Sequence, residues 1–103
     1  MLLVGPDGSG KSHLAHIWAA QVEAVLIDAS DLAQADLPGL VAAGAVCVED
    51  AESLAGHPGA ETALFHLHNM LLPAGRLLIT ATTPPRDWRL ALPDLHSRMQ
   101  AAA

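Results

Sequence analysis

The sequence predicts an α/β fold in which helices flank a largely parallel β-sheet. Short apolar runs alternate with longer stretches of helical spacing, turn residues separate the two, and the apolar runs are not interrupted by polar residues. Strands that alternate with helices are typical of parallel sheets, and strands that are apolar throughout fit a sheet covered on both faces. With 103 residues the chain suits one small domain, so residues 1–103 are expected to form a single unit.

Four apolar runs predict the strands, at residues 1–4, 24–28, 45–48 and within 76–80. Helices are expected over residues 11–23, over 58–72 and from 93 onward. Their inner faces are expected to carry Leu14, Ile17 and Trp18 in the first, Leu64, Leu67 and Leu71 in the second, and Leu92, Leu95 and Met99 in the third. Between the second and third strands, Ser30 and Asp36 are expected to cap short helical pieces, and Gly44 to end that segment.

The strongest local signal is a glycine loop, residues 5–12, whose sequence Gly-Pro-Asp-Gly-Ser-Gly-Lys-Ser matches G-x-x-x-x-G-K-[ST]. Glycines let backbone N–H groups approach a phosphate, and the start of the following helix adds partial positive charge. We expect Lys11 to reach the β- and γ-phosphates of ATP or ADP and the Ser12 hydroxyl to ligate Mg²⁺. The expected nucleotide-binding residues are Gly5, Pro6, Asp7, Gly8, Ser9, Gly10, Lys11, Ser12 and His13. A strand before the loop and a helix after it indicate a P-loop NTPase.

Two acids, Glu49 and Asp50, directly follow the apolar third strand. Carboxylates are costly at such a place unless positive charge is near, and a Mg²⁺–nucleotide complex would supply that charge. In the usual Walker B arrangement the first acid holds Mg²⁺ through water and the second polarises the attacking water. This assigns Glu49 to the metal and Asp50 to the base position, in the inverse of the usual order of Asp and Glu. The alternative is a pair of solvated acids at a strand exit.

The net charge of −6 is distributed unevenly along the chain. Residues 1–75 hold one basic residue, Lys11, against nine acids, whereas residues 76–103 hold four arginines against two acids. Because DNA binding needs Lys and Arg facing phosphates, this balance argues against direct binding of DNA.

Cys47 is the only cysteine, which excludes an internal disulfide and fits a reducing cytosol. The histidines, among them His13, His16, His66 and His68, lack a metal-binding pattern and are expected to be ordinary helix or surface residues. We see no signal peptide and no apolar stretch of the roughly 20 residues that a membrane span needs. A cytoplasmic location without membrane contact is therefore expected.

Four segments carry a family resemblance: residues 5–12, residues 46–50, the phrase Leu-Leu-Ile-Thr-Ala-Thr-Thr-Pro-Pro at 77–85 and the phrase Leu-Pro-Asp-Leu-His-Ser-Arg at 92–98. They occur in the same order in the bacterial initiator DnaA and, closer still, in its shorter homologue Hda. The chain thus resembles the DnaA/Hda family of AAA+ ATPases over nearly its whole length. The loop is shared by many NTPases, so the two later phrases are the more telling part.

The resemblance implies an AAA+ fold that binds ATP or ADP with Mg²⁺ and a cytoplasmic role in regulating chromosomal replication initiation. Members of the Hda kind act with the DNA-loaded sliding clamp to promote hydrolysis of ATP on DnaA, so DnaA and the clamp are the expected partners. Carried over by position, Arg98 matches the arginine finger, with a surface arginine as the alternative. Thr82 falls where the first sensor usually has Asp, and Thr82 or Thr80 is expected to sense the γ-phosphate or to have a structural role.

Compared with the family, the chain is expected to be cut short at both ends. The family has residues before the first strand, and after Arg98 it continues into a fifth strand and a helical lid, which the chain is expected to lack. By analogy the sheet order would be 5-1-4-3-2. The loss of strand five would leave strand one as an open edge, which favours self-association.

Three functions remain open from the sequence. The first is a nucleotide-binding regulator of replication initiation, whose intrinsic ATPase activity is expected to be weak because the arginine finger must come from a partner. The second is a small-molecule P-loop kinase, although no lid rich in arginine is visible. The third is a non-catalytic, truncated interaction module with low affinity for nucleotide.

Overall fold

The computed structural model describes residues 2–6, 8–71 and 74–102. Their strands are β1 (Leu2–Val4), β2 (Val25–Asp28), β3 (Ala45–Glu49) and β4 (Arg76–Ala81). All pair in parallel, in the order β1-β4-β3-β2. The predicted parallel sheet is therefore confirmed, and the order matches 1-4-3-2 of the family analogy. The predicted first strand begins at Met1, which lies outside the described residues.

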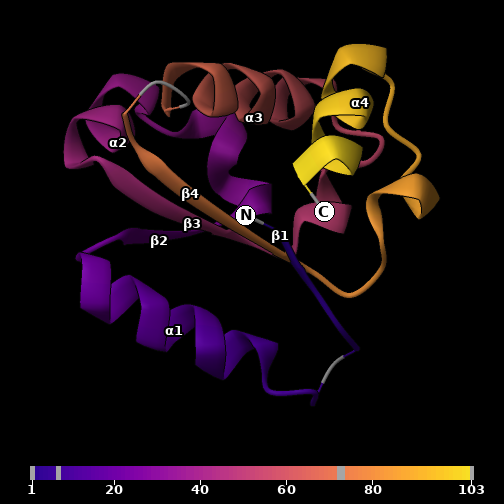
Figure 1. Cartoon of the computed structure of the whole chain (residues 1–103). Coiled ribbons are helices and arrows are strands. Elements are labelled where there is room, and N and C mark those ends of the chain that lie inside the picture. The colour runs from indigo at the N-terminus through magenta and orange to yellow at the C-terminus, as the bar shows by residue number, and fades with distance from the viewer. Residues whose placement is uncertain (1, 7, 72–73, 103) are drawn as a thin grey trace.

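Helices cover both faces of this sheet (Figure 1). One face is covered by α1 (Lys11–Val22), and the other by α2 (Leu37–Ala43) and α3 (Pro58–Leu71), with α4 (Pro93–Ala102) beside α3. Three 3₁₀ turns complete the elements: η1 (Ala29–Gln34), η2 (Ala51–Leu54) and η3 (Pro85–Asp87). Residue 72, the predicted last residue of α3, also lies outside the description. No helix within the described ranges has the length and apolar character that crossing a membrane requires.

The main core lies between the sheet and α3. Ala45–Val48 of β3 are buried on both faces, as the uninterrupted apolar run predicts. The predicted inner face of α3, Leu64, Leu67 and Leu71, is buried in the same core. In α4, Leu95 and Met99 are fully buried, and Leu92 before the helix is packed against them in part.

The predicted inner face of α1 is wrong in part. Leu14 and Ile17 are 55% and 42% exposed, and Ala15 and Ala19 are buried instead. Small alanine side chains let the helix lie close to the strands, and the rotation that buries them turns the two larger side chains toward solvent. Trp18 is half-buried and does pack against the sheet, in a small cluster that includes Cys47.

The caps between β2 and β3 differ from the prediction at one position. Asp28, not Ser30, caps η1: its carboxylate accepts the Ser30 N–H at 2.9 Å and the Ser30 hydroxyl at 2.8 Å. Asp36 occupies the N-cap position of α2 without a side-chain hydrogen bond. Gly44 ends α2 in the left-handed conformation at φ 83°, as predicted.

The core predicts a contrast between two leucines. Leu64→Ala is expected to lower the free energy of unfolding by about 2–5 kcal/mol, because Leu64 is fully buried and its loss leaves a cavity. The same change at Leu14, which is 55% exposed, should cost less than about 1 kcal/mol. Urea titration followed by circular dichroism measures both; equal losses would contradict the described packing of α1 and α3.

Candidate functional site

The candidate site lies at the edge of the sheet where all parallel strands end. Val4 pairs with Ala81 and Asp28 with Glu49, so the segments that follow these strands start side by side. The N–H of Gly5 donates to the Ala81 carbonyl at 3.0 Å and continues the pairing of β1 with β4 into the glycine loop. In open α/β sheets this carboxyl edge is where ligands bind.

Positive backbone angles shape the glycine loop. Gly8 and Gly10 have φ of 81° and 88°, a conformation that residues with a side chain rarely adopt. A Cβ atom on Gly5 would lie 2.8 Å from the Ser9 hydroxyl oxygen, so this glycine allows a close approach within the loop. The Ser9 N–H donates to the Pro6 carbonyl at 3.1 Å. Asp7, one of the predicted binding residues, lies outside the described residues.

The loop leads directly into α1, whose N-cap residue is Gly10. Glycine has no side chain to accept hydrogen bonds from the first turn, so these N–H donors are suited to an external anion. Within that turn Lys11 is buried, with 8% of its surface exposed, whereas Ser12 and His13 are exposed. The arrangement has the donors that a phosphate needs.

Ser12 and Glu49, the two residues predicted to hold Mg²⁺, lie in contact. The Ser12 hydroxyl donates to Glu49 Oε1 at 3.3 Å. His16 Nε2 lies 3.5 Å from the same oxygen, a contact that the sequence interpretation of His16 missed. A hydroxyl and a carboxylate are hard oxygen donors that suit Mg²⁺, which takes its remaining ligands from water and phosphates. No cluster of three or more His, Cys, Asp or Glu that could hold a metal exists in the described part of the chain.

Asp50 lies at the end of β3 in a left-handed conformation, φ 57°. Its N–H donates to the hydroxyl oxygen of the buried Thr80 at 3.3 Å, which attaches it to β4. Loss of water around the carboxyl raises the pKa of Asp50, as do the negative charges of Glu52, Asp28 and Glu49, against the opposing effect of Lys11. A raised pKa makes this carboxylate a stronger base than an ordinary aspartate.

Thr82 is held by an acid that the sequence analysis did not single out. Both its N–H and its hydroxyl donate to Glu52 Oε1, at 3.2 Å and 2.5 Å. Thr82 thus lies beside the glycine loop, with its hydroxyl turned to Glu52. The sequence does show an acid, Glu52, soon after Glu49 and Asp50. Its partner Thr82, directly after β4, could be found only in the fold.

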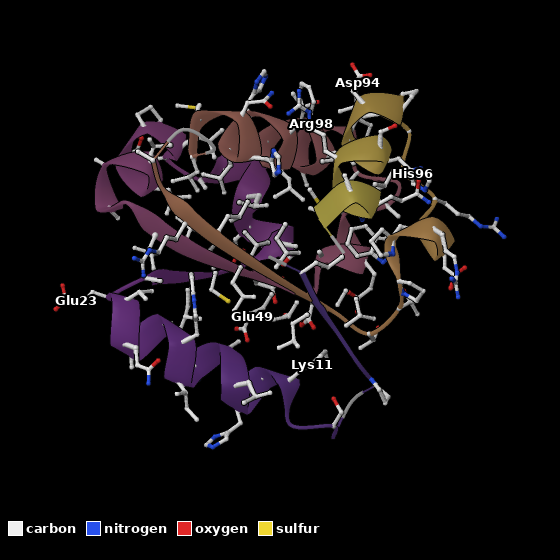
Figure 2. The ribbon with its side chains drawn as sticks, in the orientation of Figure 1. Lys11, Glu23, Glu49, Asp94, His96 and Arg98 are labelled. Carbon is white, nitrogen blue, oxygen red and sulfur yellow. The ribbon has the colours of Figure 1, made fainter. Side chains whose placement is uncertain are left out.

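The structure does not bring Arg98 to the glycine loop of its own chain. Arg98 is half-buried on α4, and Figure 2 shows it across the sheet from Lys11. Its guanidinium lies over the ring of Phe65 on α3, with 5.3 Å from the guanidinium carbon to the ring centroid. Any contact of Arg98 with nucleotide would therefore involve a nucleotide bound to another molecule.

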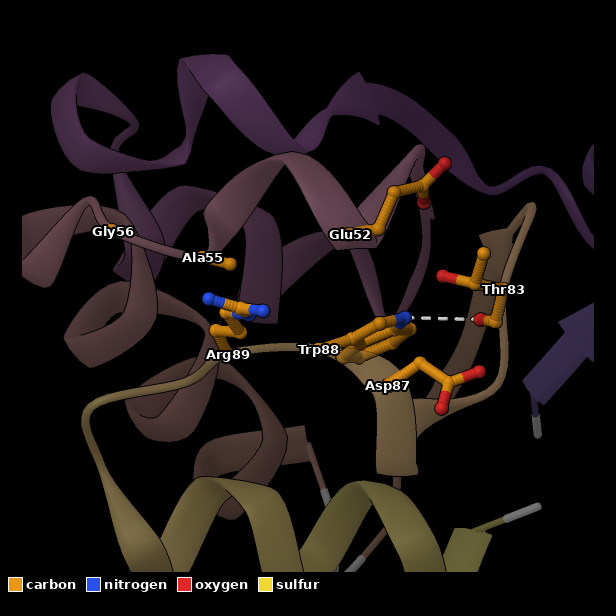
Figure 3. Close-up of a pocket in the computed structure, with 7 residues that line it drawn as sticks. All are labelled: Glu52, Ala55, Gly56, Thr83, Asp87, Trp88 and Arg89. Atoms are coloured by element: carbon orange, nitrogen blue, oxygen red, sulfur yellow. Dashed lines mark hydrogen bonds between the residues drawn. The ribbon is translucent and has the colours of Figure 1, made fainter.

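A cavity of about 390 Å³ lies between η2 and the segment that follows β4 (Figure 3). Its lining includes Glu52, Thr83 and Trp88, and the indole N–H of Trp88 donates to the Thr83 carbonyl at 2.9 Å. None of the lining residues belongs to the glycine loop, and Glu52, which binds Thr82, connects the cavity to the candidate site.

No protein-family model matches the sequence. Among solved structures, the chain is similar to a replication initiator DnaA bound to AMPPCP and single-stranded DNA, with TM-score 0.76, 21% identity, and coverage of 97% of this chain and 37% of that one. The AMPPCP-bound DnaA of Aquifex aeolicus gives TM-score 0.76, 21% identity and coverage of 98% and 38%. Domain III of DnaA from Thermotoga maritima matches with a TM-score of 0.73 and 22% sequence identity. The match covers 97% of this chain and 50% of that one.

These similarities show the fold. The chain has the fold of the AAA+ domain of DnaA, and the predicted fold class is confirmed. It spans between 37% and 50% of the length of the DnaA chains that it matches. At this level of identity, the likeness alone does not carry the activity of DnaA or of Hda over to the chain.

Burial next to the site predicts an unreactive thiol. Burial, and secondarily the charge of Glu49, raise the pKa of Cys47 from the ordinary value of 9.0 to about 11. Because the thiolate is the reactive form, its reaction with a disulfide reagent at pH 8 should be roughly a hundredfold slower than that of an exposed cysteine. Absorbance after addition of the reagent measures this rate; the folded and urea-unfolded chain reacting at the same rate would contradict the burial.

Proposed function

We propose that the chain binds ATP or ADP with Mg²⁺ in the glycine loop. The observation that carries the proposal is the contact of Ser12 with Glu49 at 3.3 Å, directly behind a loop with two left-handed glycines. The contact brings a hydroxyl from the loop and a carboxylate from the end of β3 to one point. This is the donor pair with which P-loop proteins hold the metal of a bound nucleotide.

In this proposal each residue has a separate task. Lys11 offers its ammonium to the β- and γ-phosphates, and Ser12 and Glu49 hold Mg²⁺, which neutralises phosphate charge when it is bound. Asp50, next to Glu49 at the end of β3, is the base that orients the attacking water. Thr82 senses the γ-phosphate if its hydroxyl leaves Glu52. Because the arginine finger for its own nucleotide must come from another molecule, the chain by itself would be at most a weak ATPase.

We further propose a role in the control of replication initiation, in the cytoplasm, of the kind that Hda performs. This is supported by the DnaA fold together with the Arg98 phrase, which resembles the finger segment of the family. The proposed partners are DnaA, whose bound nucleotide would meet Arg98, and the sliding clamp. One basic residue against nine acids in residues 1–75 makes direct contact of that part with DNA unfavourable.

Nucleotide binding predicts a loss of affinity when the ammonium of Lys11 is removed. Lys11→Ala should weaken binding of fluorescent ADP in the presence of Mg²⁺ by about a hundredfold, because charge-assisted hydrogen bonds to phosphate are lost. Arg76→Ala removes the same charge from the start of β4, at the opposite edge of the sheet, and should leave the affinity unchanged. Fluorescence anisotropy measures both; a wild-type chain without saturable binding, or Lys11→Ala that binds equally well, would refute the proposal.

The open edge of β1 supports a proposal of self-association. Within the described sheet β1 pairs on one side only, with β4, and Val4 is 39% exposed. The Gly5 N–H faces β4, and N–H groups alternate sides along a strand, so the Val4 N–H faces the open edge. Sedimentation at about 5 and 200 µM should show a concentration-dependent dimer that Val4→Pro, which cannot donate along this edge, weakens. A folded wild-type monomer at both concentrations would contradict it.

A further inference from the structure

The guanidinium of Arg98 lies over the ring of Phe65 and makes no ion pair with a carboxylate of the described residues. The guanidinium carbon lies 5.3 Å from the centroid of the Phe65 ring. Although the chain has 11 Asp and Glu residues, no described carboxylate lies within 4.0 Å of the Arg98 nitrogens. Even Asp94, one turn earlier on α4, makes no such pair.

The manner of this contact decides what Arg98 can still bind. A contact with an aromatic ring needs no oxygen acceptor for the N–H donors of a guanidinium, whereas an ion pair with a carboxylate would occupy those donors. Phosphate oxygens accept hydrogen bonds from two of these edge donors at once. The cation–π contact with Phe65 therefore restrains the long side chain and leaves N–H donors for an external anion.

A second contact from α3 fixes the backbone that leads to Arg98. Glu61, one turn before Phe65, is fully buried, and its Oε1 accepts the N–H groups of Ala91 at 2.8 Å and Leu92 at 3.0 Å. These residues immediately precede α4. The backbone before α4 and the side chain of Arg98 are thus attached to the same face of α3.

We propose that Phe65 is a positioning residue, which holds the guanidinium of Arg98 in the orientation that meets the phosphates of a nucleotide bound to a partner protein. The proposal rests on the proposed function, in which Arg98 acts on a nucleotide in trans. Without the ring, Arg98 keeps its charge but must be ordered at each encounter. The loss should therefore appear in the maximal rate of hydrolysis and not in the association of the two proteins.

The test uses variants of the whole chain loaded with Mg²⁺ and ADP. Each variant is mixed with the DNA-loaded sliding clamp and with ATP-bound DnaA of the same genome, and the hydrolysis of the ATP on DnaA is compared between variants. Formation of ADP on DnaA is measured over a range of chain concentrations. Phe65→Leu should lower the maximal rate of hydrolysis about three- to tenfold relative to wild type, which is the rate equivalent of one cation–π contact. The chain concentration that gives half of the maximal rate should stay within about twofold of the wild-type value. Phe65→Tyr, which keeps an aromatic face, should restore the rate.

Two further variants separate the possible failures. Arg98→Ala should abolish the stimulation, whereas Arg86→Ala, which removes an exposed arginine from η3, should not affect it. A Phe65→Leu variant as active as wild type, or a folded Phe65→Tyr as impaired as Phe65→Leu, would overturn the positioning role alone. Should Phe65→Leu fail to fold, Phe65→Met takes its place with the same expected loss. A wild-type chain that does not stimulate hydrolysis, or an active Arg98→Ala, would overturn the proposed function and the positioning role with it.

Discussion

The candidate site depends on the parallel pairing of β4 with both of its neighbours. Pairing with β1 continues through the hydrogen bond from Gly5 to Ala81, which fixes where the glycine loop starts. Pairing with β3 brings the acids that follow β3 to the same edge of the sheet. Ser12 and Glu49 are 37 residues apart in sequence, and this pairing is what places them 3.3 Å apart.

The same pairing gathers negative charge at that edge. Asp28, Glu49 and Glu52 lie close enough to Asp50 to raise its pKa, and Lys11 is the cation that opposes them. A bound Mg²⁺ would reduce this repulsion, whereas nucleotide without metal would increase it. The electrostatics of the edge therefore favour a metal–nucleotide complex over free nucleotide. The negative charge of Glu49 and the positive charge of Lys11 act on the same bound complex, one through the metal and the other through the phosphates.

What the sequence could predict follows from the kind of signal available. The uninterrupted apolar run of β3 and the leucine spacing of α3 allow one interpretation each, and both predictions are confirmed. Spacing alone could not show that alanines, not Leu14 and Ile17, face the sheet, because the distance between helix and sheet is set by tertiary packing. Contacts such as His16 with Glu49 and Thr82 with Glu52 join segments far apart in sequence, so only the strand order brings them together.

The cap of η1 illustrates a local ambiguity of another kind. Asp28 and Ser30 are both good capping residues, and Asp28 caps the turn because it ends β2 in an extended conformation that points its carboxylate at the next N–H groups. The glycine loop could be singled out from the sequence because its motif specifies both residue types and spacing, and its role in binding nucleotide stays a prediction. The orientation of Arg98 was not, because nothing in the phrase that contains it indicates the ring of Phe65.

The most direct measurement of the central claim is a crystal structure of the chain grown with Mg²⁺ and ADP. The account predicts the β-phosphate in hydrogen-bonding contact with backbone N–H groups of the glycine loop and with the Lys11 ammonium, and the metal beside the Ser12 hydroxyl on the side of Glu49. Nucleotide bound elsewhere, or a glycine loop that makes no contact with phosphate, would contradict it.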